Sequence, residues 1–95
     1  MIALIAKNGF HVGIVTRPML RLLTALYYRQ AATRDLTNQF PDLRVKAALS
    51  LLEVNGLVEV IDLLFTGYSR TGREKHMAVW RLTEKGMLYV DRETQ

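Results

Sequence analysis

The chain has 95 residues, of which 49% are hydrophobic and 23% charged, so it can build the core of one domain and is too apolar for a disordered chain. It contains no cysteine, which excludes a disulfide framework and thiolate metal sites. Thirteen Lys and Arg against nine Asp and Glu give a formal net charge of +4, a mild basic balance that permits a polyanionic partner without proving one.

The apolar residues do not form a targeting or membrane signal. The N-terminal run over residues 2–6 is too short for a signal-peptide core and is followed by Lys7. No uncharged apolar stretch approaches the roughly 20 residues that are needed to span a bilayer. We therefore expect a cytoplasmic protein with no membrane partner.

We divide the chain into an N-terminal arm or hairpin over residues 1–16 and one domain over residues 17–95. Asn8-Gly9 between two apolar runs is typical of a two-residue hairpin turn, because a type I′ turn needs a positive φ at both positions. A bent extended arm and a short helix over residues 2–7 are the alternatives. The exposed apolar character of this segment predicts a homodimer.

The spacing of apolar residues predicts a first helix over residues 17–30. Thr16 or Arg17 can begin it, and Pro18 loses no hydrogen bond in the first turn. Tyr28 falls outside the apolar stripe. The stripe predicted to face the core consists of Met19, Leu22, Leu23, Leu26 and Tyr27.

A short second helix over residues 34–40 and a third over residues 43–55 follow. Thr33 is a suitable N-cap for the second helix and Asp42 for the third, while Pro41 separates the two. Asn55-Gly56 is a strong signal for the end of the third helix. The residues predicted to face the core are Leu36, Phe40, Val45, Ala48, Leu49 and Leu52.

The periodicity then changes from helical to extended. Residues 57–66 predict a strand, residues 67–75 a polar loop bounded by glycine, and residues 76–82 a second strand, which together make an antiparallel hairpin. Thr83 can cap a last helix over residues 84–91. The side chains of this region predicted to pack inward are Trp80, Met87, Leu88 and Val90.

Two short motifs bracket this hairpin. Residues 49–58 (LSLLEVNGLV) look like the end of the recognition helix in the winged-helix superfamily, and residues 80–86 (WRLTEKG) resemble the point where the second wing strand enters its last helix. The superfamily includes the MarR-like and PadR-like regulators. The resemblance covers roughly residues 17–91 and implies an α+β winged helix-turn-helix: a three-helix core, a β-hairpin wing and a short C-terminal helix, preceded by an N-terminal strand or arm.

The resemblance implies that the third helix lies in the major groove, with the outward side chains of its N-terminal part at the base edges. Arg44 and Lys46 can donate to guanine acceptors or to phosphates. The face opposite the core stripe is mostly small and apolar, which weakens direct readout. The positions at which the resemblance implies DNA contacts are Arg44, Lys46, Ala47 and Ser50.

The predicted wing loop concentrates positive charge that can approach phosphates or enter the minor groove. Glu74 is the only acidic residue in this loop. A hairpin tip is solvated whatever its function, so charge at the tip is also compatible with a loop that binds nothing. Thr33 and Arg34 at the start of the second helix would add backbone contacts, since helix N-termini bind phosphate. The wing residues expected to contact DNA are Arg70, Arg73, Lys75 and His76.

The main prediction is a DNA-binding transcription regulator that binds double-stranded DNA as a homodimer. One alternative is a protein-interaction module that docks a protein partner through an apolar third-helix face, and another is an RNA- or replication-associated winged helix. We expect no cofactor, no metal site and no enzymatic activity, because the sequence has no phosphate-binding glycine loop, zinc-ligand spacing or nucleophile elbow. The face proposed for protein docking consists of Leu43, Ala47, Leu51 and Val54.

Overall fold

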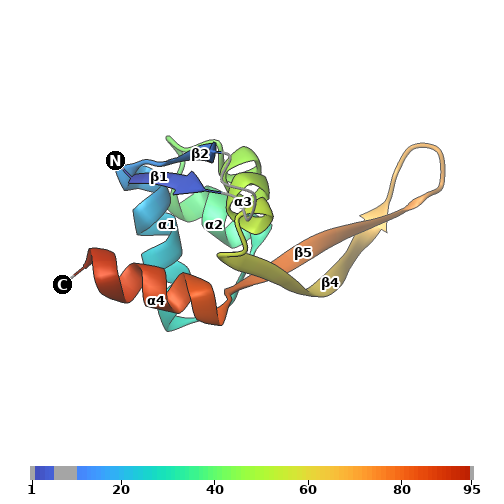
Figure 1. Cartoon of the computed structure of the whole chain (residues 1–95). Coiled ribbons are helices and arrows are strands. Elements are labelled where there is room, and N and C mark those ends of the chain that lie inside the picture. Colours follow the sequence, from blue (N-terminus) through green and yellow to red (C-terminus); the bar gives the residue numbers. More distant parts are fainter. Residues whose placement is uncertain (1, 6–10, 95) are drawn as a thin grey trace.

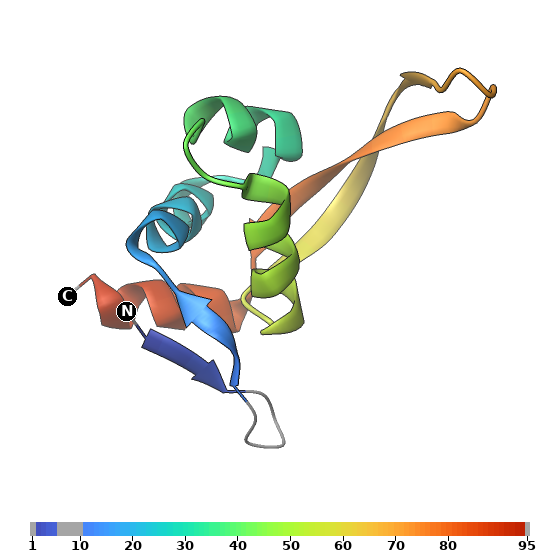
Figure 2. The same cartoon turned by 90° about the horizontal axis from the view of Figure 1, so that it is seen from above.

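The computed structural model describes residues 2–5 and 11–94. The long β4–β5 hairpin projects from the helices, and both termini lie at the other end of the molecule (Figures 1 and 2). The elements in chain order are β1 (Ile2–Ile5), β2 (His11–Val15), α1 (Arg17–Tyr28), β3 (Ala31–Ala32), α2 (Thr33–Gln39), α3 (Val45–Val54), β4 (Val58–Tyr68), β5 (Glu74–Leu82) and α4 (Glu84–Glu93).

The helices pack their predicted apolar stripes into one core. Of the two residues considered for the start of α1, Arg17 is the first helical residue and Thr16 is the N-cap, with its hydroxyl accepting a hydrogen bond from the Met19 N–H at 3.4 Å. Phe40 is half-buried at the edge of the core, and Trp80 is buried, with 8% of its surface exposed. The largest fully buried side chains are Leu22, Leu23, Leu36, Leu49, Leu52, Leu57 and Val58.

The domain contains a three-stranded antiparallel sheet in the order β3-β5-β4. The sequence analysis did not predict β3, because a two-residue strand is too short to show an alternating pattern. Its Ala31 pairs with Trp80 of β5 and its Ala32 with Val79, which ties the segment between α1 and α2 to the wing. The order of helices and strands is that of the predicted winged helix, so the α+β prediction is confirmed.

The wing strands are longer than predicted. β4 and β5 stay paired from Val58–Leu82 to Tyr68–Glu74, with register shifts between Val60 and Asp62 and between Phe65 and Gly67. Only residues 69–73 form the loop, instead of 67–75. The outer hairpin is exposed on both faces, so polar residues can continue the strands there and do not mark their ends.

The N-terminal segment adopts the hairpin alternative. β1 and β2 pair antiparallel, from Ile2 opposite Val15 to Ile5 opposite His11. The expected Asn8-Gly9 turn lies outside the described residues. None of the helices among the described residues is long and apolar enough to cross a membrane.

Two predicted N-caps were wrong. Ala32 is the N-cap of α2 and makes no side-chain capping bond, whereas Thr33 is the first helical residue. Arg44 occupies the corresponding position of α3, which begins at Val45, so Asp42 is not its cap. Residues before α3 instead form a turn, in which the Leu43 N–H donates to the Phe40 carbonyl oxygen at 3.1 Å.

Three of the predicted core positions were also wrong. Met87 and Leu88 are 43% and 59% exposed, because α4 faces the core with Gly86 and Val90, four residues apart. Tyr27, at the last turn of α1, is 36% exposed. A hydrogen bond to Asp91 and the negative charge of that carboxylate raise the pKa of Tyr27.

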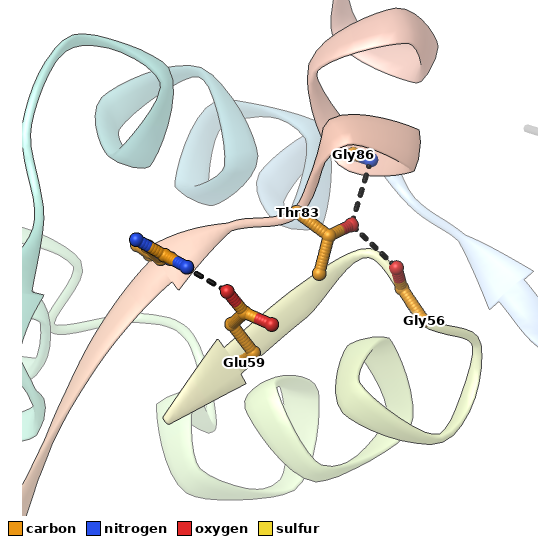
Figure 3. A network of polar contacts seen from close by, with 5 residues as sticks. Gly56, Glu59, Thr83 and Gly86 are labelled. Carbon is orange, nitrogen blue, oxygen red and sulfur yellow. Dashed lines mark hydrogen bonds and ion pairs between the residues drawn. The ribbon is translucent and has the colours of Figure 1, made fainter. Parts of the chain in front are cut away.

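The two sequence motifs meet at the junction of α3, β4 and α4 (Figure 3). The Thr83 hydroxyl donates to the Gly56 carbonyl oxygen at 2.5 Å and accepts from the Gly86 N–H at 3.0 Å, which confirms Thr83 as the cap of α4. Gly56 has a φ of +75°, the left-handed conformation typical after a helix end, as predicted from Asn55-Gly56. The Lys85 ammonium donates to the Asn55 carbonyl oxygen at 2.9 Å, so three hydrogen bonds fix where the wing leaves the core.

Candidate nucleic-acid interface

A groove of about 410 Å³ lies where α2, α3 and the wing meet. It brings together Arg34 of α2, Lys46 of α3, and Lys75 and His76 of β5. None of the described residues that line it carries a carboxylate. The described residues that line it are Thr33, Arg34, Thr37, Lys46, Thr66, Lys75, His76, Met77 and Ala78.

The cations of the groove are not neutralised by ion pairs. Two ion pairs occur among the described residues: Arg81 with Glu59, whose Nε and Oε1 atoms lie 2.6 Å apart (Figure 3), and His76 with Glu74, at 3.9 Å. Neither includes Arg34, Lys46 or Lys75, and all three side chains are exposed. The groove is therefore a concentrated positive surface.

Thr33 lines the groove but is held by the fold. Its hydroxyl donates to the Ala78 carbonyl oxygen at 3.2 Å and accepts from the Trp80 indole N–H at 2.9 Å. The Arg34 N–H is directed to the sulfur of Met77 at 3.4 Å. At the start of α2, the Arg34 side chain is therefore better placed to contact a ligand than the backbone is.

Thr37 and Thr66 also line the groove, and the sequence analysis did not single them out. Both hydroxyls donate to carbonyl oxygens of the chain, Thr37 to Thr33 at 2.9 Å and Thr66 to Lys75 at 3.2 Å. Their oxygens retain acceptor capacity. Thr37 lies one helical turn after Thr33, a spacing that could have suggested it; no local signal points to Thr66.

The outward side of α3 carries the other predicted contacts. Arg44, Ala47 and Ser50 are exposed, together with Lys46. Ala47 and Ser50 offer a methyl group and one hydroxyl to a ligand, so this helix carries few groups for reading base edges.

The apolar third-helix face considered for protein docking is smaller than expected. Leu43 lies before α3 and is half-buried against the core, and Leu51 is half-buried against the core as well. Ala47 and Val54 remain exposed, Val54 at 70%. Two of its four members therefore already have partners within the domain.

Arg70 and Arg73 lie in the loop over residues 69–73, which forms the tip of the wing (Figures 1 and 2), and neither lines the groove. Ser69 organises this loop: its N–H donates to the Arg73 carbonyl oxygen at 2.8 Å, and its hydroxyl accepts from the Arg73 N–H at 3.1 Å. The predicted wing site is thus divided. Lys75 and His76 belong to the groove, and the two arginines belong to the tip.

An exposed aromatic cluster lies along the outer wing and was not anticipated from the sequence. The ring of Phe65 meets that of Tyr68 edge to face at a centroid distance of 5.3 Å, and that of His76 at 5.9 Å. Phe65 and Tyr68 are 54% and 66% exposed. His76 therefore belongs to both the groove and the cluster.

No family model matches the chain, and no curated protein matches it. Among solved structures, a mutant of Lactococcus lactis ZitR with two substitutions is similar to it, with a TM-score of 0.63 and 18% sequence identity. The similarity covers 99% of this chain and 59% of the ZitR chain, so the chain spans less than two thirds of the length of that protein. The topology and this similarity together establish that the chain has the winged-helix fold.

Proposed function

We propose that this protein is a transcription regulator that binds double-stranded DNA through α3, the basic groove and the wing. The observation that carries the proposal is the groove itself, in which Arg34 of α2, Lys46 of α3 and Lys75 of β5 converge; among the described residues, none of the three is in an ion pair and no carboxylate lines the groove. The similarity in fold to ZitR and the sequence resemblance to MarR-like and PadR-like regulators support the same function.

In this proposal, α3 enters the major groove with its N-terminal end. Arg44 and Lys46 reach base edges or phosphates, while Ala47 and Ser50 make small contacts with the bases. Arg34 and Lys75 hold the phosphate backbone beside the recognition helix. The tip arginines reach the flanking backbone or the minor groove. Because few groups of α3 can read bases, phosphate contacts dominate the affinity, which makes binding strongly salt-dependent.

The test is a fluorescence anisotropy titration of duplex DNA across a salt series, comparing the wild type with Arg34→Ala/Lys46→Ala/Lys75→Ala. Each lost phosphate contact should reduce the slope of log K against log salt by about 0.9, so the triple variant should bind more weakly and with a slope flatter by about 2 to 3. All three side chains are exposed, so the fold should be unaffected.

The matched control is Arg17→Ala/Arg21→Ala/Arg29→Ala, which removes the same charge from α1 and the residue that follows it. Both variants lower the formal net charge from +4 to +1. If the control weakens binding as much as the groove variant does, the groove is not the binding site. If the wild type does not bind duplex DNA even at low salt, the proposed function is wrong.

We also propose that the protein is a homodimer and that α4 contributes to its interface. Leu88 and Met87 expose apolar surface on α4, at the end of the molecule opposite the wing (Figure 1). A dimer formed there leaves both wings free for DNA. We expect Leu88→Glu to convert a dimer into a monomer in sedimentation equilibrium, because the interface would have to desolvate a carboxylate. A wild-type monomer at high concentration would contradict this proposal.

A further inference from the structure

The outer half of the wing exposes more apolar surface than a solvated hairpin needs. Leu63, Leu64, Phe65 and Tyr68 are all exposed, from 44% for Leu64 to 66% for Tyr68. These four lie close together in β4, where Leu63 and Leu64 lie opposite Ala78 and Met77 of β5, which contact α2, and Phe65 and Tyr68 lie nearer the tip. Apolar patches of this kind usually mark an interaction site.

The register of the hairpin sorts these side chains between two faces. His76 lies directly opposite Phe65, and Leu63 lies two residues before Phe65, so the three share one face. The register shift between Phe65 and Gly67 inserts an extra residue, which returns Tyr68 to the same face and brings its ring against Phe65. We call Leu63, Phe65, Tyr68 and His76 the aromatic face; Leu64, opposite Met77, lies on the other face.

We propose that the aromatic face binds unpaired bases of a nucleic acid by stacking, while the basic residues beside it hold the phosphates of the same strand. The inference rests on the proposed function and extends it to DNA with an unpaired segment. Exposed rings next to cations are the combination that single-stranded nucleic acids require, because each nucleotide offers an apolar base and a charged phosphate.

The charges on the wing favour this ligand over a second copy of the chain. Arg70, Arg73 and Lys75 flank the aromatic face, against two carboxylates: Glu74, which lies opposite Tyr68 and 3.9 Å from His76, and Asp62, which accepts a hydrogen bond from the Leu63 N–H. The cations outnumber the carboxylates, so two wings packed face to face would bring an excess of like charge together. A fully paired duplex also fits less well, because its base faces are stacked inside and it presents only edges and phosphates.

The experiment measures the affinity of the full chain for two fluorescent probes at one salt concentration: a duplex, and the same duplex extended by an unpaired overhang. The variant is Phe65→Leu/Tyr68→Leu, which keeps apolar side chains and removes both rings. The control is Leu64→Ala, on the opposite face. Circular dichroism should give the same spectrum for all three proteins, because these positions are exposed.

We expect the wild type and Leu64→Ala to bind the overhang probe at least about fivefold more tightly than the duplex, since stacking of one base on an aromatic ring contributes about that factor or more. In the ring variant this preference should disappear while duplex affinity is unchanged. Tight binding of the overhang without any duplex binding would support the stacking site and contradict the proposed regulator.

Three results would overturn the inference. The first is equal affinity of the wild type for both probes, which leaves duplex binding and the proposed function intact. The second is an equal loss of preference in Leu64→Ala, which would assign the effect to the wing as a whole. The third is a sedimentation experiment in which the wild type self-associates and the ring variant does not, because the aromatic face would then bind a second copy.

Discussion

Replacing Gly86 with alanine is expected to destabilise the protein by roughly 1–3 kcal/mol, as overpacking of a buried site does. In an ordinary helix interior the same change stabilises by up to about 1 kcal/mol, so the expected sign is reversed. A Cβ atom on Gly86 would overlap the carbonyl oxygen of Leu57 and lie 3.0 Å from its carbonyl carbon. That oxygen accepts the Thr83 N–H at 3.1 Å, so the carbonyl group cannot turn away without losing this bond.

The measurement is urea denaturation followed by circular dichroism, at several protein concentrations. Ser50→Ala, at an exposed position of α3, is the control and should change the free energy of unfolding by less than about 0.5 kcal/mol. A Gly86→Ala protein as stable as the wild type would show that α4 can shift away from Leu57 at no cost. In that case, the close packing of α4 against Leu57 would not be the reason for a glycine at position 86.

Leu49→Ala should destabilise the protein by about 2–5 kcal/mol, the range for removing a buried leucine side chain. Leu49 has no exposed surface and lies in the core cluster. A domain has only about 5–15 kcal/mol of total stability, so this variant should be close to unfolding at ambient temperature. Because α3 carries Lys46, Ala47 and Ser50, the proposed DNA binding should fall with the folded fraction.

The matched control is Val54→Ala, in the same helix but 70% exposed, which should change stability by less than about 0.5 kcal/mol. Denaturant midpoints for the two variants and the wild type give the comparison. Equal midpoints for Leu49→Ala and Val54→Ala would contradict the placement of α3 against the core.

The sequence predicted those features that depend on neighbours along the chain. A buried helix face repeats every three to four residues, so the stripes of α1 and α3 were read correctly except at Tyr27. Caps that use a local hydrogen bond were also found: Thr16, Thr83 and the left-handed Gly56. Each of these needs at most four neighbouring residues to form.

The predictions that failed depend on distant partners. The Thr33 hydroxyl is bonded to Ala78 and Trp80 of β5, so it does not cap α2. In α4, the close approach of Gly86 to Leu57 selects the buried face and leaves Met87 and Leu88 exposed. A helix of this length can bury either of two overlapping faces, and only the neighbouring elements select one.

By itself, the sequence determined the winged-helix order of elements, the composition of the core and the positive charge of the wing, because periodicity, caps and charge are properties of short segments. Only the tertiary structure decided which charges act together. It brought Arg34, Lys46 and Lys75 to one groove and left Arg70 and Arg73 in the wing loop, outside the groove lining. The pairing of β3 and β4 with β5 is the physical reason, since strand register positions residues that lie far apart in the chain.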